Sequence, residues 1–408
     1  MALSDEIKLE PSLRGSDAVS GSPPRQPKKQ LAVPGLVAKY EFLVTSCILS
    51  IVLIAHYILK QAWAAPFVNI HYQVGTDKYI RGRDDLYFVL YWLVKLSFLR
   101  SLLMKYVFPV IAQWAGVSPT SRKCLRICEV GWMFTYYITM WCIGFKIMYN
   151  SPYWLNTTNL YAGYPEDHMV MPYNLKWFYL VQLAFWFENL YIIHVEERRK
   201  DHYEMLTHHF VTISLVIASY HTYFTRWGHV FMLIMDAPDI FLTLAKLLRY
   251  LGFNRICNYI FGLFAVCWFI TKHYFCFVMM LSIWTQAEIL IPEEKRYPNH
   301  PNSYATYPLM YGFLGVLCVL QAILLIWMWM LLKIIIKAIT EQRVEDTRSD
   351  TEELDETTPE PNVHESCPPP IAKKAPPVVS FVYLSLAVCV FGVIFHYYPQ
   401  LVYSVYSA

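Results

Sequence analysis

The sequence carries little charge for its length, and this shortage excludes several classes of protein. Of its 408 residues, 16% are Asp, Glu, Lys or Arg, whereas 56% are hydrophobic. Soluble domains have roughly 25% charged residues, and disordered chains are poor in hydrophobic ones. The balance therefore excludes a disordered, collagenous or nucleic-acid-coating protein, and no nucleic-acid partner is expected. The net charge of +3 is too small to indicate an acidic partner.

The ten cysteines lack a pattern of pairing, so no disulfide framework is expected. Most of them fall inside apolar runs, where a thiol behaves as a small hydrophobic group. Cys124 and Cys128 are spaced like neighbours on a helix face, but no second pair completes a zinc site. No signal peptide is expected either, because no apolar core follows Met1.

Long uncharged runs dominate the chain in place of charge. Runs of about 20 residues are long enough to cross the ~30 Å of bilayer hydrocarbon as a helix. The sequence therefore predicts an all-α polytopic membrane protein. The candidate spans are 40–60, 86–111, 127–149, 176–195, 205–224, 229–249, 256–284, 305–337 and 379–398.

The two polar stretches outside the spans differ in composition. Residues 1–39 are polar and rich in proline, which predicts a disordered tail. Residues 339–378 are acidic and rich in proline, which predicts an extended linker. Within it, Ser349 has an acid three residues on at Glu352, as at an acid-directed kinase site. Residues 379–408 then form a candidate transmembrane or interfacial helix.

Basic residues predict the orientation of the spans, because cytosolic loops are enriched in Lys and Arg. With the N-terminal tail in the cytosol, every even-numbered connection is basic. The loops at 150–175 and 285–304 then lie in the lumen, and the first contains Asn156-Thr157-Thr158, an N-glycosylation acceptor pattern. The predicted cytosolic connections carry Arg122, Lys123, Arg126, Arg198, Arg199, Lys200, Arg249, Arg255, Lys333, Lys337 and Arg343.

Two neighbouring histidines and two aspartates are the strongest chemical signal. His208 and His209 open the fifth span, and Asp236 and Asp239 lie three residues apart in the sixth. This spacing puts both carboxylates on one face of a helix. The short connection 225–228 predicts an antiparallel hairpin, with the imidazoles nearer the cytosolic side than the acids. An ionisable group inside a span usually has a function.

Three other interpretations of these residues stay open. The first is a structural hydrogen bond between His and Asp on packed helices, and the second is a proton relay or ligand cradle in a transporter. The third is a metal site, but only His202, His208 and His209 cluster, and their spacing fits neither the HxxxH nor the HxxHH block of membrane di-iron oxygenases. We therefore expect no metal. Other polar residues that could line the same cavity or join helices are Glu188, Gln182, Lys272, His273 and Gln321.

The segment that holds the four residues resembles a known family. KDHYEMLTHHFVT from Lys200, followed by SYHTYFTRWGHVFMLIMDAPDIFLTLAKLLRY, is similar to the TLC-domain signature of ceramide synthases. The resemblance covers about 120–338 and includes the runs from Glu129 and Phe178 and the span with Trp268 and His273. It implies a six-helix TLC bundle or barrel made by spans three to eight, with two N-terminal spans in 40–119. The apolar run near the C-terminus departs from the relatives, which end in a cytosolic acidic tail.

The resemblance implies an N-acyltransferase of the endoplasmic-reticulum membrane. Such an enzyme joins the amine of a sphingoid base to the acyl group of a fatty acyl-CoA, without a further cofactor. Similar fungal enzymes work as dimers with a small single-span accessory subunit. The family's catalytic histidines and aspartates correspond to His208, His209, Asp236 and Asp239. Residues expected to bind substrate are Arg198, Arg199, Lys200, Arg249, Arg255, Glu188, Trp268 and His273.

Two routes of acyl transfer are compatible with these residues. A histidine can act as the general base for direct attack by the amine, since imidazole titrates near neutral pH. Alternatively, a histidine attacks first and forms an acyl-imidazole. A member of the family without enzymatic activity, which binds or transports lipid, is the alternative function.

Overall fold

Helices make up nearly all the regular structure of the part described, residues 36–195, 201–300 and 302–341 of a computed structural model. The predicted all-α polytopic membrane protein is confirmed. The ninth candidate span, the N-terminal tail up to residue 35, most of the acidic linker and Ser349 lie outside the described residues. The long helical segments are α1 (Leu36–Leu53) with η1 (Ile54–Ile58), α3 (Asp85–Leu102) with η3 (Leu103–Val107) and α4 (Phe108–Trp114), α5 (Arg122–Tyr149), α7 (Tyr173–Val195), α8 (His202–His221), α9 (Thr225–Tyr250), α10 (Asn254–Trp268) with η5 (Phe269–Phe275) and α11 (Cys276–Leu290), and α12 (Tyr307–Glu341).

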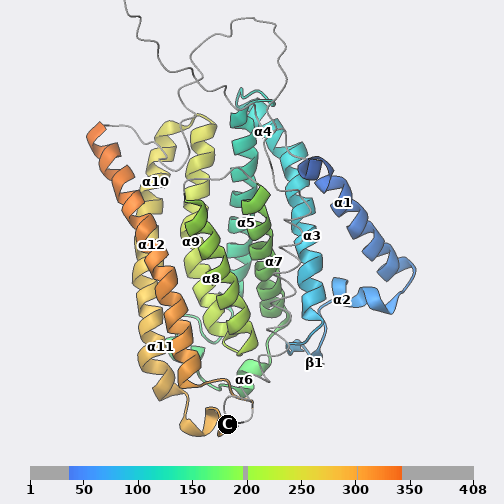
Figure 1. Ribbon diagram of the computed structural model, residues 1–408, viewed down its shortest axis with the longest axis vertical. Coiled ribbons are helices and arrows are strands. Elements are labelled where there is room, and N and C mark those ends of the chain that lie inside the picture. The colour runs from blue at the N-terminus through green and yellow to red at the C-terminus, as the bar shows by residue number, and fades with distance from the viewer. Residues whose placement is uncertain (1–35, 196–200, 301, 342–408) are drawn as a thin grey trace, which may run out of the picture.

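Shorter elements lie between these segments. They are η2 (Ala62–Ala64), α2 (Ala65–Val68), η4 (Thr157–Leu160), α6 (Glu166–Met169), η6 (Glu293–Lys295), and the antiparallel strands β1 (Gln73–Gly75) and β2 (Lys78–Tyr79). An isolated bridge also joins Tyr79 to Met171, so the small sheet lies against the segment before α7. In Figure 1, α6 and β1 lie at the lower end of the molecule and α4 lies at the upper end.

The long helical segments from α5 to α12 form a closed ring. Helix α5 packs on α7, α7 on α8, and α8 on α12; α12 packs on α11, η5 on α9, and α9 back on α5. Helices α3 and α1 lie outside this ring on one side, α3 against α7 and α1 against α3 (Figure 1). The ring matches the bundle of spans three to eight that the resemblance implies.

The helices differ in polarity according to their place in this arrangement. Within the described ranges, four stretches are long and apolar enough to cross a membrane: Tyr40–Ile58, Asp85–Trp114, Asn254–Leu290 and Tyr307–Ile336. Most of each stretch is not covered by the protein, as expected of surfaces that face lipid. Helices α5, α7, α8 and α9 carry more polar side chains, and α7 is buried along most of its length.

The connection between α8 and α9 differs from the predicted one. It spans 222–224, and α9 begins at Thr225 rather than after Gly228. Tyr223 has a φ of 65°, which breaks the helix there. Gly228 is helical instead, because its amide donates to the carbonyl of Phe224 at 3.0 Å. Gly228 therefore belongs to α9 and not to the connection that the sequence predicts.

A buried ion pair ties α7 to the first residue of α3. Lys176 of α7 is fully buried, and its Nζ lies 2.7 Å from Oδ1 of Asp85. The same Nζ donates to the carbonyl of His71 at 3.0 Å and to that of Ile80 at 2.7 Å. The ammonium group thus has three oxygen partners within the described part of the protein.

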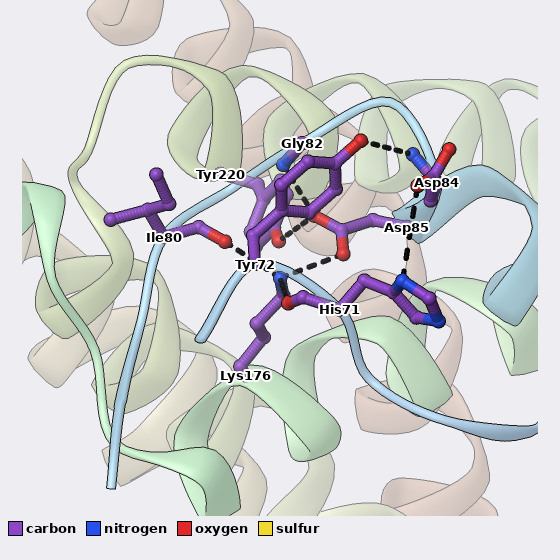
Figure 2. Close-up of polar contacts among 8 residues, drawn as sticks. All are labelled: His71, Tyr72, Ile80, Gly82, Asp84, Asp85, Lys176 and Tyr220. Carbon is purple, nitrogen blue, oxygen red and sulfur yellow. Dashed lines mark hydrogen bonds and ion pairs between the residues drawn. The ribbon is translucent and has the colours of Figure 1, made fainter. Parts of the chain in front are cut away.

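Asp85 links the same cluster to α8. Its Oδ2 accepts from the Gly82 amide and from the Tyr220 hydroxyl, both at 2.7 Å. Figure 2 shows the Lys176, Asp85 and Tyr220 side chains converging between the loop and the helices. Three segments far apart in the sequence therefore meet at one carboxylate near the lower end of the ring.

Replacing Lys176 with Met should destabilise the protein, because it leaves the buried Asp85 carboxylate without its counter-charge. Breaking a buried ion pair costs about 3–5 kcal/mol. The measurement is the midpoint of thermal unfolding in detergent. The double variant Lys176→Met/Asp85→Asn should recover part of the loss, since an amide keeps an acceptor for Gly82 without the charge. Equal stability of K176M and the wild type would contradict the assigned role of the pair.

Candidate functional site

A cavity lies inside the ring, with about 670 Å³ of space between its walls, part of which is open to the surroundings. Its walls come from α7, α8, α9, η5 and α12. The acidic and basic side chains in its lining are His208, Asp236, Asp239 and Lys272. The other lining residues are Tyr179, Trp186, Thr212, Leu215, Val216, Ser219, Trp227, Gly228, Phe231, Met232, Met235, Phe313, Leu320 and Leu324.

Helical rise places the histidine and the acids at similar depth. His208 lies 13 residues above the lower end of α8, which ends at His221, so about 20 Å. Asp239 lies 14 residues above Thr225, the first residue of α9, so about 21 Å. His208 is thus level with Asp239, so the prediction that the imidazoles lie nearer the cytosolic side than both acids is wrong for this pair. The reason is that α9 begins one turn earlier than predicted.

Asp236 is held by a hydrogen-bonded chain from two other helices. Its Oδ2 accepts from Nε2 of Gln182 on α7 at 3.0 Å. Oε1 of Gln182 in turn accepts from the Tyr136 hydroxyl on α5, also at 3.0 Å. All three residues are buried. The chain fixes the orientation of the carboxyl group toward the cavity.

Asp239 forms an ion pair instead. Its Oδ2 lies 2.7 Å from Nζ of Lys272, and the Lys272 ammonium also lies over the ring of Trp268, 4.3 Å from its centroid. Lys272 belongs to η5, a π-helical stretch within an otherwise α-helical segment. Such stretches add a residue to a helical turn and are frequent at functional sites. The π turn brings Lys272 into the ring.

The two histidines have different surroundings. The ring of His208 lies 5.2 Å from that of Trp327 and 5.7 Å from that of Trp186, and its buried Nδ1 has no hydrogen-bond partner among the described residues. The ring of His209 lies 5.8 Å from that of His208, and its Nδ1 lies 2.5 Å from the carbonyl oxygen of Met205. Nδ1 of His209 can reach this carbonyl only as a donor, so the neutral ring keeps its lone pair on Nε2.

Other residues expected at the site lie outside the cavity lining. Glu188 lies against Arg100, with Oε1 3.4 Å from Nε, and Arg100 also pairs with Glu41 of α1 at 2.7 Å. Nδ1 of His273 lies 2.6 Å from Nε2 of Gln321 on α12. Both contacts join neighbouring helices.

The expected binding residues near the helix ends are only partly within the described residues. Arg249 lies at the end of α9 and Arg255 at the start of α10, on the upper side of the ring. Arg198, Arg199 and Lys200 lie outside the described part of the chain. Trp268 packs under Lys272, as given above. Asn156 is exposed in the loop after α5, and its Oδ1 accepts from the amide of Thr158 at 3.1 Å.

The donor set of the cavity does not resemble a metal centre. Within residues 36–195, 201–300 and 302–341, no group of three or more His, Cys, Asp or Glu side chains is arranged to hold a metal ion. One imidazole and two carboxyl groups face the cavity, and one of the carboxyl groups is already neutralised by Lys272.

Sequence reasoning left two parts of the site undetermined. Tyr136, which supports Gln182, carried no signal because tyrosine is abundant along the whole chain. The sequence identifies Lys272 only as one of several polar residues that could line a cavity or join helices. Its inward position depends on the π turn of η5, which no periodicity in the sequence reveals.

Comparisons with known proteins agree on one family. A family model for the TLC domain matches residues 126–333. The chain is 34% identical to Sphingosine N-acyltransferase lag1 of Schizosaccharomyces pombe, over 72% of this chain and 74% of the relative. It is 32% identical to Ceramide synthase LAG1 of Saccharomyces cerevisiae, over 74% and 72% respectively. It is 30% identical to Ceramide Synthase FUM18 of Gibberella moniliformis, over 76% and 78%.

Replacing Gln182 with Leu should destabilise the protein, because the buried carboxyl group of Asp236 loses its hydrogen-bond donor. An unsatisfied buried polar group costs about 1–3 kcal/mol, and more when it is charged. The thermal midpoint in detergent measures the effect. Gln321→Leu is a matched control, since it removes the same amide from a contact with a neutral partner, His273, and should cost less. The same loss in both variants would contradict a special dependence of Asp236 on Gln182.

Proposed function

This chain belongs to the TLC-domain family, and from that premise we propose that it is a ceramide synthase. In the proposed reaction a fatty acyl-CoA N-acylates a sphingoid base, sphinganine or phytosphingosine. The relatives named sphingosine N-acyltransferase or ceramide synthase support this activity. The observation that carries the proposal is the shared cavity, which an imidazole, two carboxyl groups and long apolar walls line together.

His208 is the proposed reacting imidazole. It lines the cavity, and its buried Nδ1 is unpaired among the described residues, so a substrate group can supply the partner. A sphingoid amine is protonated at neutral pH and cannot attack a thioester until it loses a proton. Imidazole has the pKa that this proton transfer requires. His209 lies beside His208 and supports it in the same aromatic surroundings.

The acids are proposed to receive the amino head group. Asp239 already pairs with the Lys272 ammonium, whereas the donor to Asp236 is the neutral amide of Gln182. Asp236 is therefore better placed to attract an incoming ammonium group. Asp236 accepts from Gln182 and Asp239 pairs with Lys272, so neither acid orients an imidazole in this mechanism.

Both chemical routes fit this arrangement. In direct transfer, His208 takes one proton from the ammonium group and the free amine then attacks the thioester carbon. The carbon–sulfur bond breaks, and the second proton of the amine leaves with CoA as the thiol. In the covalent route, the imidazole nitrogen of His208 attacks first, CoA leaves, and the amine then attacks the acyl-imidazole. The two routes differ in whether CoA is released before the amine arrives.

The orientation and location are part of the same proposal. We place the chain in the endoplasmic-reticulum membrane with the upper end of Figure 1 in the cytosol, because Arg122, Arg249 and Arg255 lie there. The phosphates of CoA are too polar for hydrocarbon and would stay at this basic end. Assembly into a dimer with a small single-span subunit is an expectation from the resemblance.

His208→Ala should abolish ceramide formation by the purified protein. General acid–base catalysis contributes about 10²- to 10⁴-fold, so we expect at least a hundredfold loss of kcat. The assay mixes sphinganine and palmitoyl-CoA and measures ceramide by mass spectrometry. His56→Ala is the control, because His56 lies in η1 outside the ring and should leave the rate unchanged.

The same assay separates the alternatives. Release of CoA by the wild type from acyl-CoA alone, in one equivalent and lost in H208A, would indicate the covalent route, whereas release only after sphinganine is added would indicate direct attack. A wild-type protein that binds the lipid yet forms no ceramide would favour the non-enzymatic function. Wild-type activity in H208A would remove His208 from the mechanism.

Asn156 should carry an N-linked glycan if the lower end of Figure 1 faces the lumen. After expression in a eukaryotic host, digestion with an N-glycosidase should increase the gel mobility of the wild type. Both Asn156→Gln and Thr158→Ala should remove this shift, because each destroys the acceptor pattern. A wild-type band that does not move on digestion would contradict the proposed orientation.

A further inference from the structure

Two hydroxyl groups lie in contact in the lower part of the cavity lining. The Tyr179 hydroxyl of α7 lies 2.8 Å from Oγ of Ser219 on α8, and both residues are buried. Ser219 also donates to the carbonyl of Val216 at 3.0 Å, one turn higher on α8. All three residues line the cavity. The Tyr179–Ser219 pair, which we call the floor, thus lies across the cavity between two helices.

Gly228 of α9 completes the floor. A Cβ atom at this position would lie only 1.8 Å from the Tyr179 hydroxyl and 2.8 Å from Oγ of Ser219. Only glycine therefore allows the three helices to approach this closely. The Tyr179–Ser219 pair and α9 are therefore in close contact at this level.

The buried ion-pair cluster of Figure 2 supports the floor from behind. Lys176 lies one turn before Tyr179 on α7, and Tyr220 follows Ser219 on α8. The rings of Tyr179 and Tyr220 lie 5.8 Å apart, and Asp85 holds both Tyr220 and Lys176 (Figure 2). The cluster fixes α7 against α8 at the level of the floor, so the floor cannot easily recede.

The depth of the cavity follows from two helices independently. Eleven residues separate His208 from Ser219 on α8, and eleven separate Asp239 from Gly228 on α9. Both intervals correspond to about 16 Å. The hydrocarbon of a bilayer is ~30 Å thick and holds two layers of acyl chains, so one chain spans about 15 Å. Between these levels the walls are mainly apolar, with Leu215, Val216, Met232, Phe313, Leu320 and Leu324 among them.

We propose that the floor formed by Tyr179 and Ser219 against Gly228 sets the longest acyl chain that the enzyme accepts. This inference rests on the proposed ceramide synthase function. The thioester is held at the level of His208, the acyl chain extends down the cavity, and its methyl end meets the floor. A chain of about one leaflet in length fits, and a much longer one does not.

Two substitutions should move the length limit in opposite directions. Tyr179→Leu removes the ring end and hydroxyl and deepens the cavity, whereas Val216→Phe fills it one turn above the floor. The test measures kcat/KM of the purified full chain with palmitoyl-, stearoyl-, behenoyl- and lignoceroyl-CoA. The wild type should lose activity from stearoyl- to lignoceroyl-CoA. From the transfer free energy of two methylene groups, we expect the ratio of behenoyl to palmitoyl activity to rise about tenfold in Y179L. The same ratio should fall by a similar factor in V216F.

Tyr153→Leu is the matched control. Tyr153 is an equally buried tyrosine whose hydroxyl lies 2.9 Å from Nδ1 of His229, outside the cavity lining. Y153L should keep the wild-type ratio even if its total activity falls. If the wild type and all three variants form ceramide with the same ratio of behenoyl to palmitoyl activity, the floor does not set the length limit, while the proposed function stands. A wild type that prefers lignoceroyl-CoA would overturn the length limit too, and absence of product from every acyl-CoA would overturn both proposals.

Discussion

A polar side chain inside the hydrocarbon of a bilayer has to find its partner within the protein, because lipid offers none. In this chain the requirement is met by pairs that join separate helices. Asp236 bonds to Gln182 across α9 and α7, Asp239 pairs with Lys272 across α9 and η5, and Asp85 pairs with Lys176 across α3 and α7. Each pair specifies which faces of two helices must meet. The rotation of α7 and α9 about their axes is therefore determined by polar contacts as much as by apolar packing.

The polar side chains that line the cavity are not spread evenly along it. The upper part of the cavity holds His208, Asp236, Asp239 and Lys272, whereas the lower part is mainly apolar down to the hydroxyl groups of Tyr179 and Ser219. Beneath them the loop before α3 adds a second layer, in which the guanidinium of Arg81 lies over the Tyr223 ring, 4.1 Å from its centroid. A cavity that is polar at one end and mainly apolar at the other would favour one orientation of a bound amphiphile.

Much of the fold follows from the sequence, because length and polarity alone mark a helix that crosses a membrane. The first eight predicted spans each correspond to a helical segment of the structure. The hairpin of α8 and α9 could also be predicted, and it brings His208, Asp236 and Asp239 to one cavity. The partners of the acids could not, since they depend on the relative rotation of helices and on the π turn at Lys272. The sequence places Gly228 in the connection between the two helices, because local sequence cannot reveal the Tyr179 hydroxyl that approaches it.

The contrast between the acids and His208 supports the proposal that His208 is the reacting group. Leaving a buried polar atom unpaired costs about 1–3 kcal/mol, so folded proteins rarely do so without a reason. Both acids have partners here, and so does Nδ1 of His209, but Nδ1 of His208 has none among the described residues. This nitrogen belongs to a side chain that lines the cavity and contacts two tryptophan rings, those of Trp186 and Trp327. A substrate that donates a hydrogen bond to Nδ1 of His208 would remove the cost of leaving this atom unpaired. The free energy recovered in this way would increase the affinity for the substrate.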